Sequence, residues 1–268
     1  MFDTLKELGF QVEIHSHAEA ILSVDFPEAV SQLEDAVGSL SIPIEEIIGS
    51  GGGETQGTQR LRRSLAALGW KKMNFIVEKT INGQRREAIS HEIDHVKQFD
   101  KGIVALEIEW NNKDPFFDRD LENFKRLHAD GAISVGVIVT RGTTMQDNMK
   151  ELVQRFAYER GLNSNDAVEE FGMARTKRQR TAVENRVSAS GCSFEEAWAS
   201  LFVADKYGAA TTHWSKLEAR VHRGVGNPCP LVLIGLPSSI VRFDQNIDLE
   251  DIVEEENALI RDAIASES

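Results

Sequence analysis

Residues 73–98 contain the feature that most restricts how this chain can fold, a strong signal for a β-hairpin. Asn82-Gly83 follows a stretch rich in β-branched residues. An Asn-Gly pair supplies the two positive-φ positions of a type I′ turn, whose twist matches that of two paired strands. We therefore expect antiparallel strands over residues 73–81 and 84 to about 98.

A third strand is expected directly after this hairpin, over residues 103–110. The even positions are apolar there, whereas Glu107 and Glu109 occupy odd positions. Because side chains of a strand alternate between its two faces, the two carboxylates point the same way. A solvated strand face would show the same pattern, so the meaning of the two glutamates depends on their neighbours.

The second hairpin strand carries a candidate zinc motif, formed by His91, Glu92 and His95. These residues spell H-E-x-x-H, in which two histidines on one helix face hold zinc and the glutamate activates water. The motif needs a helix, whereas the hairpin predicts a strand, and the charged Asp94 stands between Glu92 and the second histidine. A zinc metallopeptidase that uses His91, Glu92 and His95 remains an alternative.

A second metal pattern overlaps the first, because Asp94, Glu107 and Glu109 spell D-x12-E-x-E. If the two strands are neighbours, Asp94 and Glu107 can hold Mg²⁺ between them, since this ion prefers oxygen ligands. Glu109 can then face the attacking water. Such a set suits phosphodiester hydrolysis, because the metal neutralises charge that develops on phosphate oxygens and lowers the pKa of water.

The following residues predict a strand, helix and strand in succession. Asp118 can cap a helix that runs to about residue 128, and Leu121 and Phe124 lie on its inner face. An apolar strand over residues 132–140 comes next.

Four further elements are expected outside this segment. They are helices over residues 59–68 and 146–160, a helix that starts at a Ser193–Glu196 capping box, and a buried strand over residues 231–236. The whole pattern predicts an α/β (α+β) fold with a mixed central sheet flanked by helices.

Charge is unevenly distributed along the 268 residues, whose formal net charge is −13. Residues 244–268 contain nine acidic residues and one arginine, so this tail, which we expect to be helical, holds −8 of the total. Because physiological salt screens charges over about 8 Å, basic patches elsewhere act independently of the tail. The acidic balance therefore does not exclude a nucleic-acid partner.

Export and membrane insertion are not predicted. The N-terminus lacks the basic and apolar regions of a signal peptide, and no apolar run approaches the roughly 20 residues of a membrane span. Cys192 and Cys229 are the two cysteines, which form neither a disulfide framework nor a C-x-x-C pair. We expect a cytoplasmic protein with two reduced thiols.

The sequence around the acidic pattern resembles a known family. The resemblance is strongest in residues 107–128, EIEWNNKDPFFDRDLENFKRLH, and in residues 131–142, GAISVGVIVTRG. Both are similar to type II restriction endonucleases of the BglII and BamHI group, whose fold is the PD-(D/E)XK nuclease core. The resemblance covers roughly residues 49–240, which implies a nuclease domain there and makes residues 1–48 an extension packed on it.

This resemblance implies roles for the acidic residues. Asp94 and Glu107 would hold Mg²⁺, two ions in each active site, and Glu109 would occupy the position where most enzymes of this fold carry lysine. Glu78 is a further candidate for catalysis, as is Glu54 at the start of the expected arginine-bearing helix.

The same resemblance implies double-stranded DNA as substrate and a homodimer that cuts both strands at a short palindromic site. We expect DNA-recognition elements over about residues 171–227. The candidate DNA-binding residues are Arg60, Arg63, Arg175, Lys177, Arg178, Arg180, His213 and Lys216. A non-catalytic DNA-binding module is the second alternative, after the zinc metallopeptidase.

Overall fold

The structure, a computed structural model, describes residues 1–49, 56–173 and 175–243, without the side chains of residues 79 and 85–89. The chain forms two compact units. The first comprises Met1–Leu40, Thr58–Thr143 and Thr212–Pro237, and the second comprises Ser41–Gly57, Thr144–Thr211 and Ser238–Ser268.

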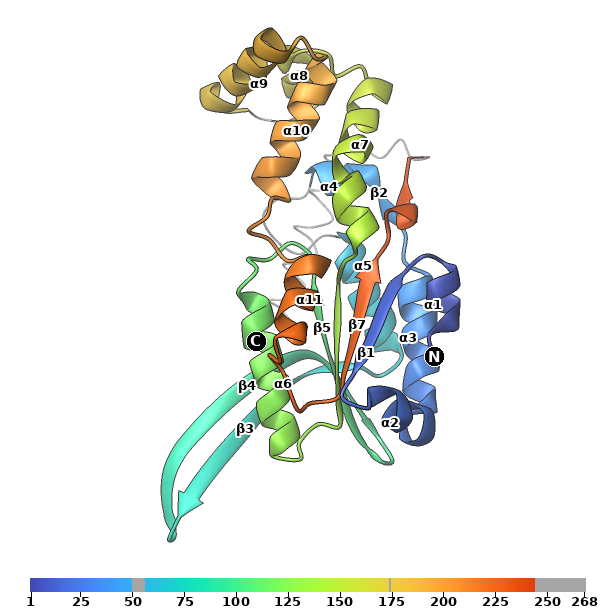
Figure 1. Cartoon of the computed structure of the whole chain (residues 1–268), viewed down its shortest axis with the longest axis vertical. Helices are drawn as coiled ribbons and strands as arrows, with labels where there is room; N and C mark the ends of the chain where they lie inside the picture. The colour runs from blue at the N-terminus through green and yellow to red at the C-terminus, as the bar shows by residue number, and fades with distance from the viewer. Residues whose placement is uncertain (50–55, 174, 244–268) are drawn as a thin grey trace. The chain divides into compact units, whose positions relative to one another are not determined.

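A six-stranded mixed sheet forms the centre of the first unit, in the order β1-β7-β6-β5-β4-β3 (Figure 1). The strands are β1 (Gln11–His15), β3 (Lys71–Ile81), β4 (Gln84–Phe99), β5 (Gly102–Glu109), β6 (Val135–Arg141) and β7 (Leu231–Leu236). The three central strands β5, β6 and β7 are parallel, whereas the other neighbouring pairs are antiparallel. The expected α/β fold with a mixed sheet is confirmed.

The β3–β4 hairpin turns at the expected pair of residues. Asn82 has a φ of 51° and Gly83 a φ of 76°, so both adopt the left-handed conformation of a type I′ turn. The sequence signal was therefore sufficient to locate both strands and the connection between them.

A β-bulge interrupts β4 where it pairs with the edge strand β3. Met73 pairs with Ile93, but Lys71 pairs with Val96, so β4 has one residue more than β3 between these two pairs. An extra residue reverses the alternation of side chains between the faces. Ile93 and Val96 consequently belong to the same core cluster although they are three positions apart.

Helices cover both faces of the sheet. On one face α6 (Phe116–Ala129) and α11 (Trp214–His222) pack in a core cluster with Val96, Ala105 and Leu233. On the other face Lys97 Nζ donates to Gln32 Oε1 of α3 (Pro27–Gly38), and to the carbonyl of Leu68, just after α5 (Gln56–Ala67). The short helices α1 (Asp3–Glu7) and α2 (Ala18–Asp25) flank β1 in the chain.

Helix α6 connects β5 to β6 as the sequence predicts, but it begins earlier than expected. Its N-cap is Pro115, and Asp118 lies inside the first turn with its carboxylate 3.0 Å from Arg220 Nη2. The expectation that Asp118 caps the helix is therefore wrong. The fixed φ of proline suits a helix start without a capping side chain.

The second unit is mainly helical. Its elements are β2 (Ile42–Pro43), α4 (Ile44–Gly49), α7 (Thr143–Glu159), α8 (Asn165–Glu170), α9 (Lys177–Ser190), α10 (Phe194–Lys206), the 3₁₀ helix Ser238–Ile240 and β8 (Val241–Arg242). Ser193 caps α10, because its Oγ accepts from the Glu196 backbone N–H, which confirms the predicted N-cap. Among the helices of the described residues, none is long and apolar enough to cross a membrane.

Candidate active site

Four acidic side chains converge where β4, β5 and α6 meet. Glu107 and Glu109 lie two positions apart on β5, so they share one face of the sheet. On β4, His95 pairs with Leu106, which places Asp94 and Glu107 at the next position of the register. Asp120 approaches the same face from α6, and its charge acts on both glutamates.

The β4 bulge decides which residue of this strand joins the group. Val96 and Ala105 pair with each other and face α6, so Asp94, two positions before Val96, is directed to the same side. Without the extra residue, the face that carries Ile93 would continue with His95 instead. The bulge thus brings Asp94 to the glutamates, a common arrangement next to active sites.

Burial makes the negative charges of this group costly. Asp120 is 0%, Glu109 2% and Glu107 3% exposed. Burial, together with the charges of Asp120, Asp94 and Glu109, raises the pKa of Glu107 to about 10. Burial and the charge of Asp120 raise the pKa of Glu109 to about 8, and burial also raises the pKa of Asp120.

Two polar side chains orient Glu109. Asn112 Nδ2 donates to Glu109 Oε2 over 2.7 Å, and Arg119 Nη2 lies 3.5 Å from Oε1. The same guanidinium contacts Asp120 Oδ1, with Nε and Nη2 both at 2.8 Å. Each carboxylate oxygen of Glu109 therefore has its own polar neighbour, which restricts the rotation of the side chain.

The loop that carries Asn112 is itself anchored to the carboxyl ends of the parallel strands. Arg141, fully buried at the end of β6, donates to the carbonyls of Trp110 and Thr212 over 2.8 and 2.7 Å. The backbone of Asn112 also exchanges hydrogen bonds with Thr212. The residues after β5 are thus held in place around the acidic group.

The donor set fits a hard divalent cation. All four acids offer carboxylate oxygens, the ligands that Mg²⁺ prefers, and Asp120 Oδ2 is buried without a hydrogen bond from any described residue. A cation beside these groups would favour the ionised carboxylates that the protein alone disfavours. Within the described residues, no three of these acids bring one ligand atom each within 4.8 Å of one another. Asp94, Glu107 and Asp120 are therefore the residues that could hold an ion that draws their side chains together.

The H-E-x-x-H interpretation is wrong, because all three of its residues lie in the strand β4. His91 Nδ1 contacts Asn123 of α6 over 2.7 Å, whereas His95 is influenced by Arg62 of α5 on the other face. Positions four apart on a strand are also separated by about 13 Å. Burial lowers the pKa of His95 to about 4, so this ring is a neutral core side chain.

Of the two other acidic candidates, Glu78 lies away from the group. Glu78 is exposed on β3, where it pairs with Ala88. It is six positions from Lys72, the β3 residue that lies beside the bulge. Six positions on a strand span about 20 Å. Glu54 lies outside the described residues.

The candidate DNA-binding residues of the first unit lie on two helices. Arg60 and Arg63 are on α5, and Arg63 is exposed. Lys216 on α11 lies 3.7 Å from Asp114, whereas His213 is buried at the N-cap of the same helix with Nδ1 3.2 Å from Ser215 Oγ. Arg63 and Lys216 therefore reach solvent more readily than His213.

The candidates of the second unit gather around the start of α9. Lys177 and Arg178 are exposed and line a shallow hollow with Thr181, Ala182 and Asn185. Arg180 instead forms ion pairs with Asp166 and Glu169 at 2.6 and 2.8 Å, and Arg175 is half-buried with its pKa lowered by burial. Lys177 and Arg178 are the more accessible pair.

Asp120 was not recognised in the sequence, although a signal was present. Phe117, Asp120, Leu121 and Phe124 recur at the three- and four-residue spacing of one helix face, and all four are buried. An aspartate on the apolar face of a helix is costly unless it has a partner. A buried aspartate that conflicts with the apolar pattern of α6 is therefore a candidate for a functional position.

Comparison with known proteins identifies a similar family over most of the chain. Residues 10–236 match the family model described as Restriction endonuclease BglII/BglIII. The match begins within the segment expected to be an extension, which is consistent with β1 being part of the central sheet. A search of curated proteins found no match.

Proposed function

We propose that this chain, which belongs to the restriction endonuclease BglII/BglIII family, is a type II enzyme that cuts both DNA strands at a short palindromic site with Mg²⁺. Membership makes it a site-specific deoxyribonuclease. The observation that carries the proposed mechanism is the group of four acids between β4, β5 and α6, three of them almost fully buried.

Asp94, Glu107 and Asp120 would hold the metal, which we expect to be two Mg²⁺ ions in each active site. When bound, Mg²⁺ supplies positive charge next to the scissile phosphate and favours ionisation of water. Asp94 and Glu107 provide oxygens from two adjacent strands, and Asp120 provides the buried Oδ2 from the opposite helix. The rigid sheet fixes two of these ligands, which limits the reorganisation needed during the reaction.

Glu109 would accept a proton from the attacking water. Without metal its raised pKa leaves this carboxyl protonated at neutral pH, and the charge of a bound ion would favour the ionised form, which can accept a proton. Asn112 and Arg119 hold its two oxygens in one orientation. In the proposed role Glu109 does the work of the lysine found in most enzymes of this fold.

The proposed substrate is double-stranded DNA, bound by a homodimer with one active site for each strand. Twofold symmetry of the protein matches the symmetry of a palindromic site. Arg63, Lys177, Arg178 and Lys216 are the candidates for DNA contacts, of which arginines can bind guanine in a bidentate manner. We expect this enzyme to act in the cytoplasm.

Digestion of a plasmid of known sequence with purified protein and Mg²⁺ tests the proposal. We expect discrete fragments, whose mapped ends give the site and the cut position. Asp94→Asn and Glu109→Gln should each reduce the cleavage rate by about 10²–10⁴-fold, because a metal ligand or the base is lost. Both variants should still retard a DNA fragment that contains the site.

Glu92→Gln serves as the matched control. Glu92 is exposed on the same strand, where it pairs with Lys72 at 2.8 Å, and it is the glutamate of the H-E-x-x-H pattern. This variant should cleave like the wild type. Site-specific binding without cleavage in the wild type would instead support a non-catalytic DNA-binding module.

A further inference from the structure

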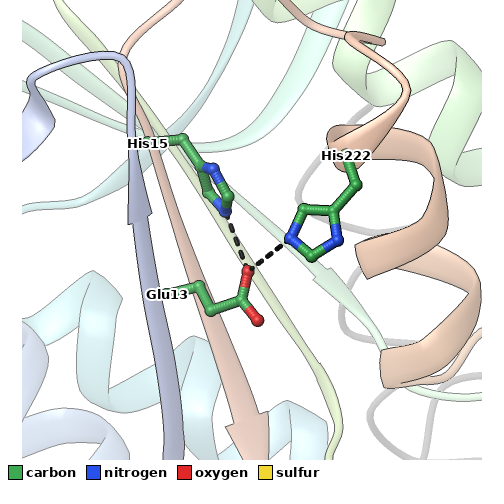
Figure 2. A group of neighbouring side chains, drawn as sticks. All are labelled: Glu13, His15 and His222. Atoms are coloured by element: carbon green, nitrogen blue, oxygen red, sulfur yellow. Dashed lines mark hydrogen bonds and ion pairs between the residues drawn. The ribbon is translucent and has the colours of Figure 1, made fainter.

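We propose that Glu13, His15 and His222 form a second metal site, suited to Zn²⁺ and related transition-metal ions and distinct from the acidic group. Figure 2 shows the two imidazole rings directed at the Glu13 carboxylate, with Glu13 and His15 on β1 and His222 at the end of α11. One ligand atom from each residue lies within 4.8 Å of the other two.

The fold places these side chains on a common face. Glu13 and His15 are two positions apart on β1 and pair with Leu233 and Leu231 of β7, and both leucines pack in the core cluster with α11. The face of β1 that carries Glu13 and His15 is therefore the face that α11 covers. His222, the last residue of α11, completes the group.

The distances are close to those of a tetrahedral zinc site. Glu13 Oε2 lies 2.9 Å from His15 Nε2 and 3.5 Å from His222 Nε2. Zinc bonds of about 2.1 Å place neighbouring ligand atoms about 3.4 Å apart. The two ring centroids are 5.8 Å apart, and the partial exposure of all three side chains leaves them room to rotate around an ion.

The chemistry of the ligands separates this site from the acidic group. Two imidazoles and one carboxylate suit Zn²⁺, Co²⁺ or Ni²⁺, whereas a group made only of carboxylates suits Mg²⁺. An ordinary ion pair joins one histidine to one carboxylate. Here the Nε2 atoms of both histidines are directed at the same Glu13 oxygen, so three ligand atoms converge. Three protein ligands leave the fourth position of a tetrahedral site open to water.

A bound ion would join parts of the chain that are far apart in sequence. It would link the strand β1, at the edge of the sheet, to α11, more than two hundred positions later. Because a ligand that binds only the folded state stabilises it, metal should raise the unfolding temperature. Stabilisation of the fold by this metal does not depend on the proposed nuclease mechanism.

Titration calorimetry with Zn²⁺, performed in excess Mg²⁺ to occupy the acidic group, tests the site. We expect one equivalent of Zn²⁺ to bind per chain and to raise the unfolding temperature by several degrees. His222→Ala should abolish both effects, and it should fold normally because this side chain is 58% exposed. His15→Ala should give the same loss.

His17→Ala and Asp94→Asn are the controls. His17 is exposed and two positions from His15 but outside the group, and Asp94 belongs to the acidic group. Both variants should bind Zn²⁺ like the wild type, and Co²⁺ should give a four- or five-coordinate visible spectrum that His222→Ala lacks. Absence of stoichiometric binding, binding that survives His222→Ala, or binding that Asp94→Asn removes would each overturn the proposal.

Discussion

Glu109 and Asp120 show how a residue acquires its chemistry from its surroundings. Both carboxylates are almost completely buried, next to each other and beside the guanidinium of Arg119. In water each would be ionised at neutral pH, but here the pKa of both is raised. The group is therefore an acidic site that requires an additional positive charge to ionise fully.

Asp120→Asn tests whether Asp120, the acid of the group that the sequence did not predict, takes part in metal binding. The amide keeps the shape of the carboxylate but removes its charge, so metal should bind more weakly. We expect the Mg²⁺ concentration for half-maximal cleavage to rise by about 10–100-fold. Asp118→Asn, an exposed change on the same helix, should leave this concentration unchanged; an equal effect of both variants would exclude a role for Asp120 in metal binding.

The stability of the metal-free protein should depend on pH through Glu107 and Glu109. Their folded-state pKa values lie above the ordinary 4.5, so their contribution to stability is complete below pH 4.5. It is lost as the pH rises toward about 8 for Glu109 and about 10 for Glu107, because the unfolded chain releases these protons first. The unfolding temperature in EDTA should therefore fall over this range.

Thermal unfolding at about pH 6 and at about pH 8.5, each with EDTA or with Mg²⁺, measures how the unfolding temperature depends on the protonation of this group. Mg²⁺ should stabilise the protein more at the higher pH. Glu109→Gln should unfold at a higher temperature than the wild type in EDTA at the higher pH, and its pH dependence should be weaker. Equal stabilisation by Mg²⁺ at both pH values would contradict the buried acidic site.

At the level of elements, the close packing of α6 on β6 holds Asp120 over the sheet. Gly136 lies beneath Phe124 of α6, and a Cβ at this glycine would be 2.5 Å from Phe124 Cδ2 and 2.8 Å from Cγ. A side chain here would displace the ring and the helix that carries it. The glycine thus sets how near Asp120 comes to Glu107 and Glu109.

Gly136→Ala should lower the free energy of unfolding by about 1–3 kcal/mol, the usual cost of overpacking a core. Phe124→Leu in the same chain should recover part of this loss, because the smaller side chain makes room for the new methyl group. Urea unfolding of both single variants and the double variant measures the coupling. Additive losses would show that the contact does not determine the position of α6.

At the level of the whole molecule, the proposed homodimer would cut the two strands of a palindrome with two active sites related by symmetry. The acidic group of Asp94, Glu107, Glu109 and Asp120 lies entirely within the first unit. The accessible basic residues Lys177 and Arg178 belong to the second unit. We therefore propose that the first unit carries the catalytic group and that the second unit contributes part of the DNA contacts.

Mixed dimers of wild-type chains and Glu109→Gln chains test this symmetry. Each mixed dimer has one intact active site, so it should nick one strand at the recognition site and convert supercoiled plasmid to open circles. Dimers of two wild-type chains should linearise the plasmid, and dimers of two variant chains should do neither. Double-strand cleavage by purified mixed dimers would contradict one active site for each strand.

The local sequence determined the elements from which the site is made. Asn82-Gly83 located the hairpin, and the period of two placed Glu107 and Glu109 on one face. Both signals depend only on backbone conformation and on the alternation of side chains along a strand, which neighbouring residues set. The family resemblance, borne out by the match over residues 10–236, gave the nuclease function.

The tertiary structure decided which further residues meet these glutamates. The bulge in β4 turned Asp94 toward them and separated His91 from His95, and the packing of α6 on the sheet added Asp120. The approach of α11 to β1 brought His222 to Glu13 and His15. These contacts depend on the register of strands and the packing of helices from distant parts of the chain, for which local periodicity carries no information.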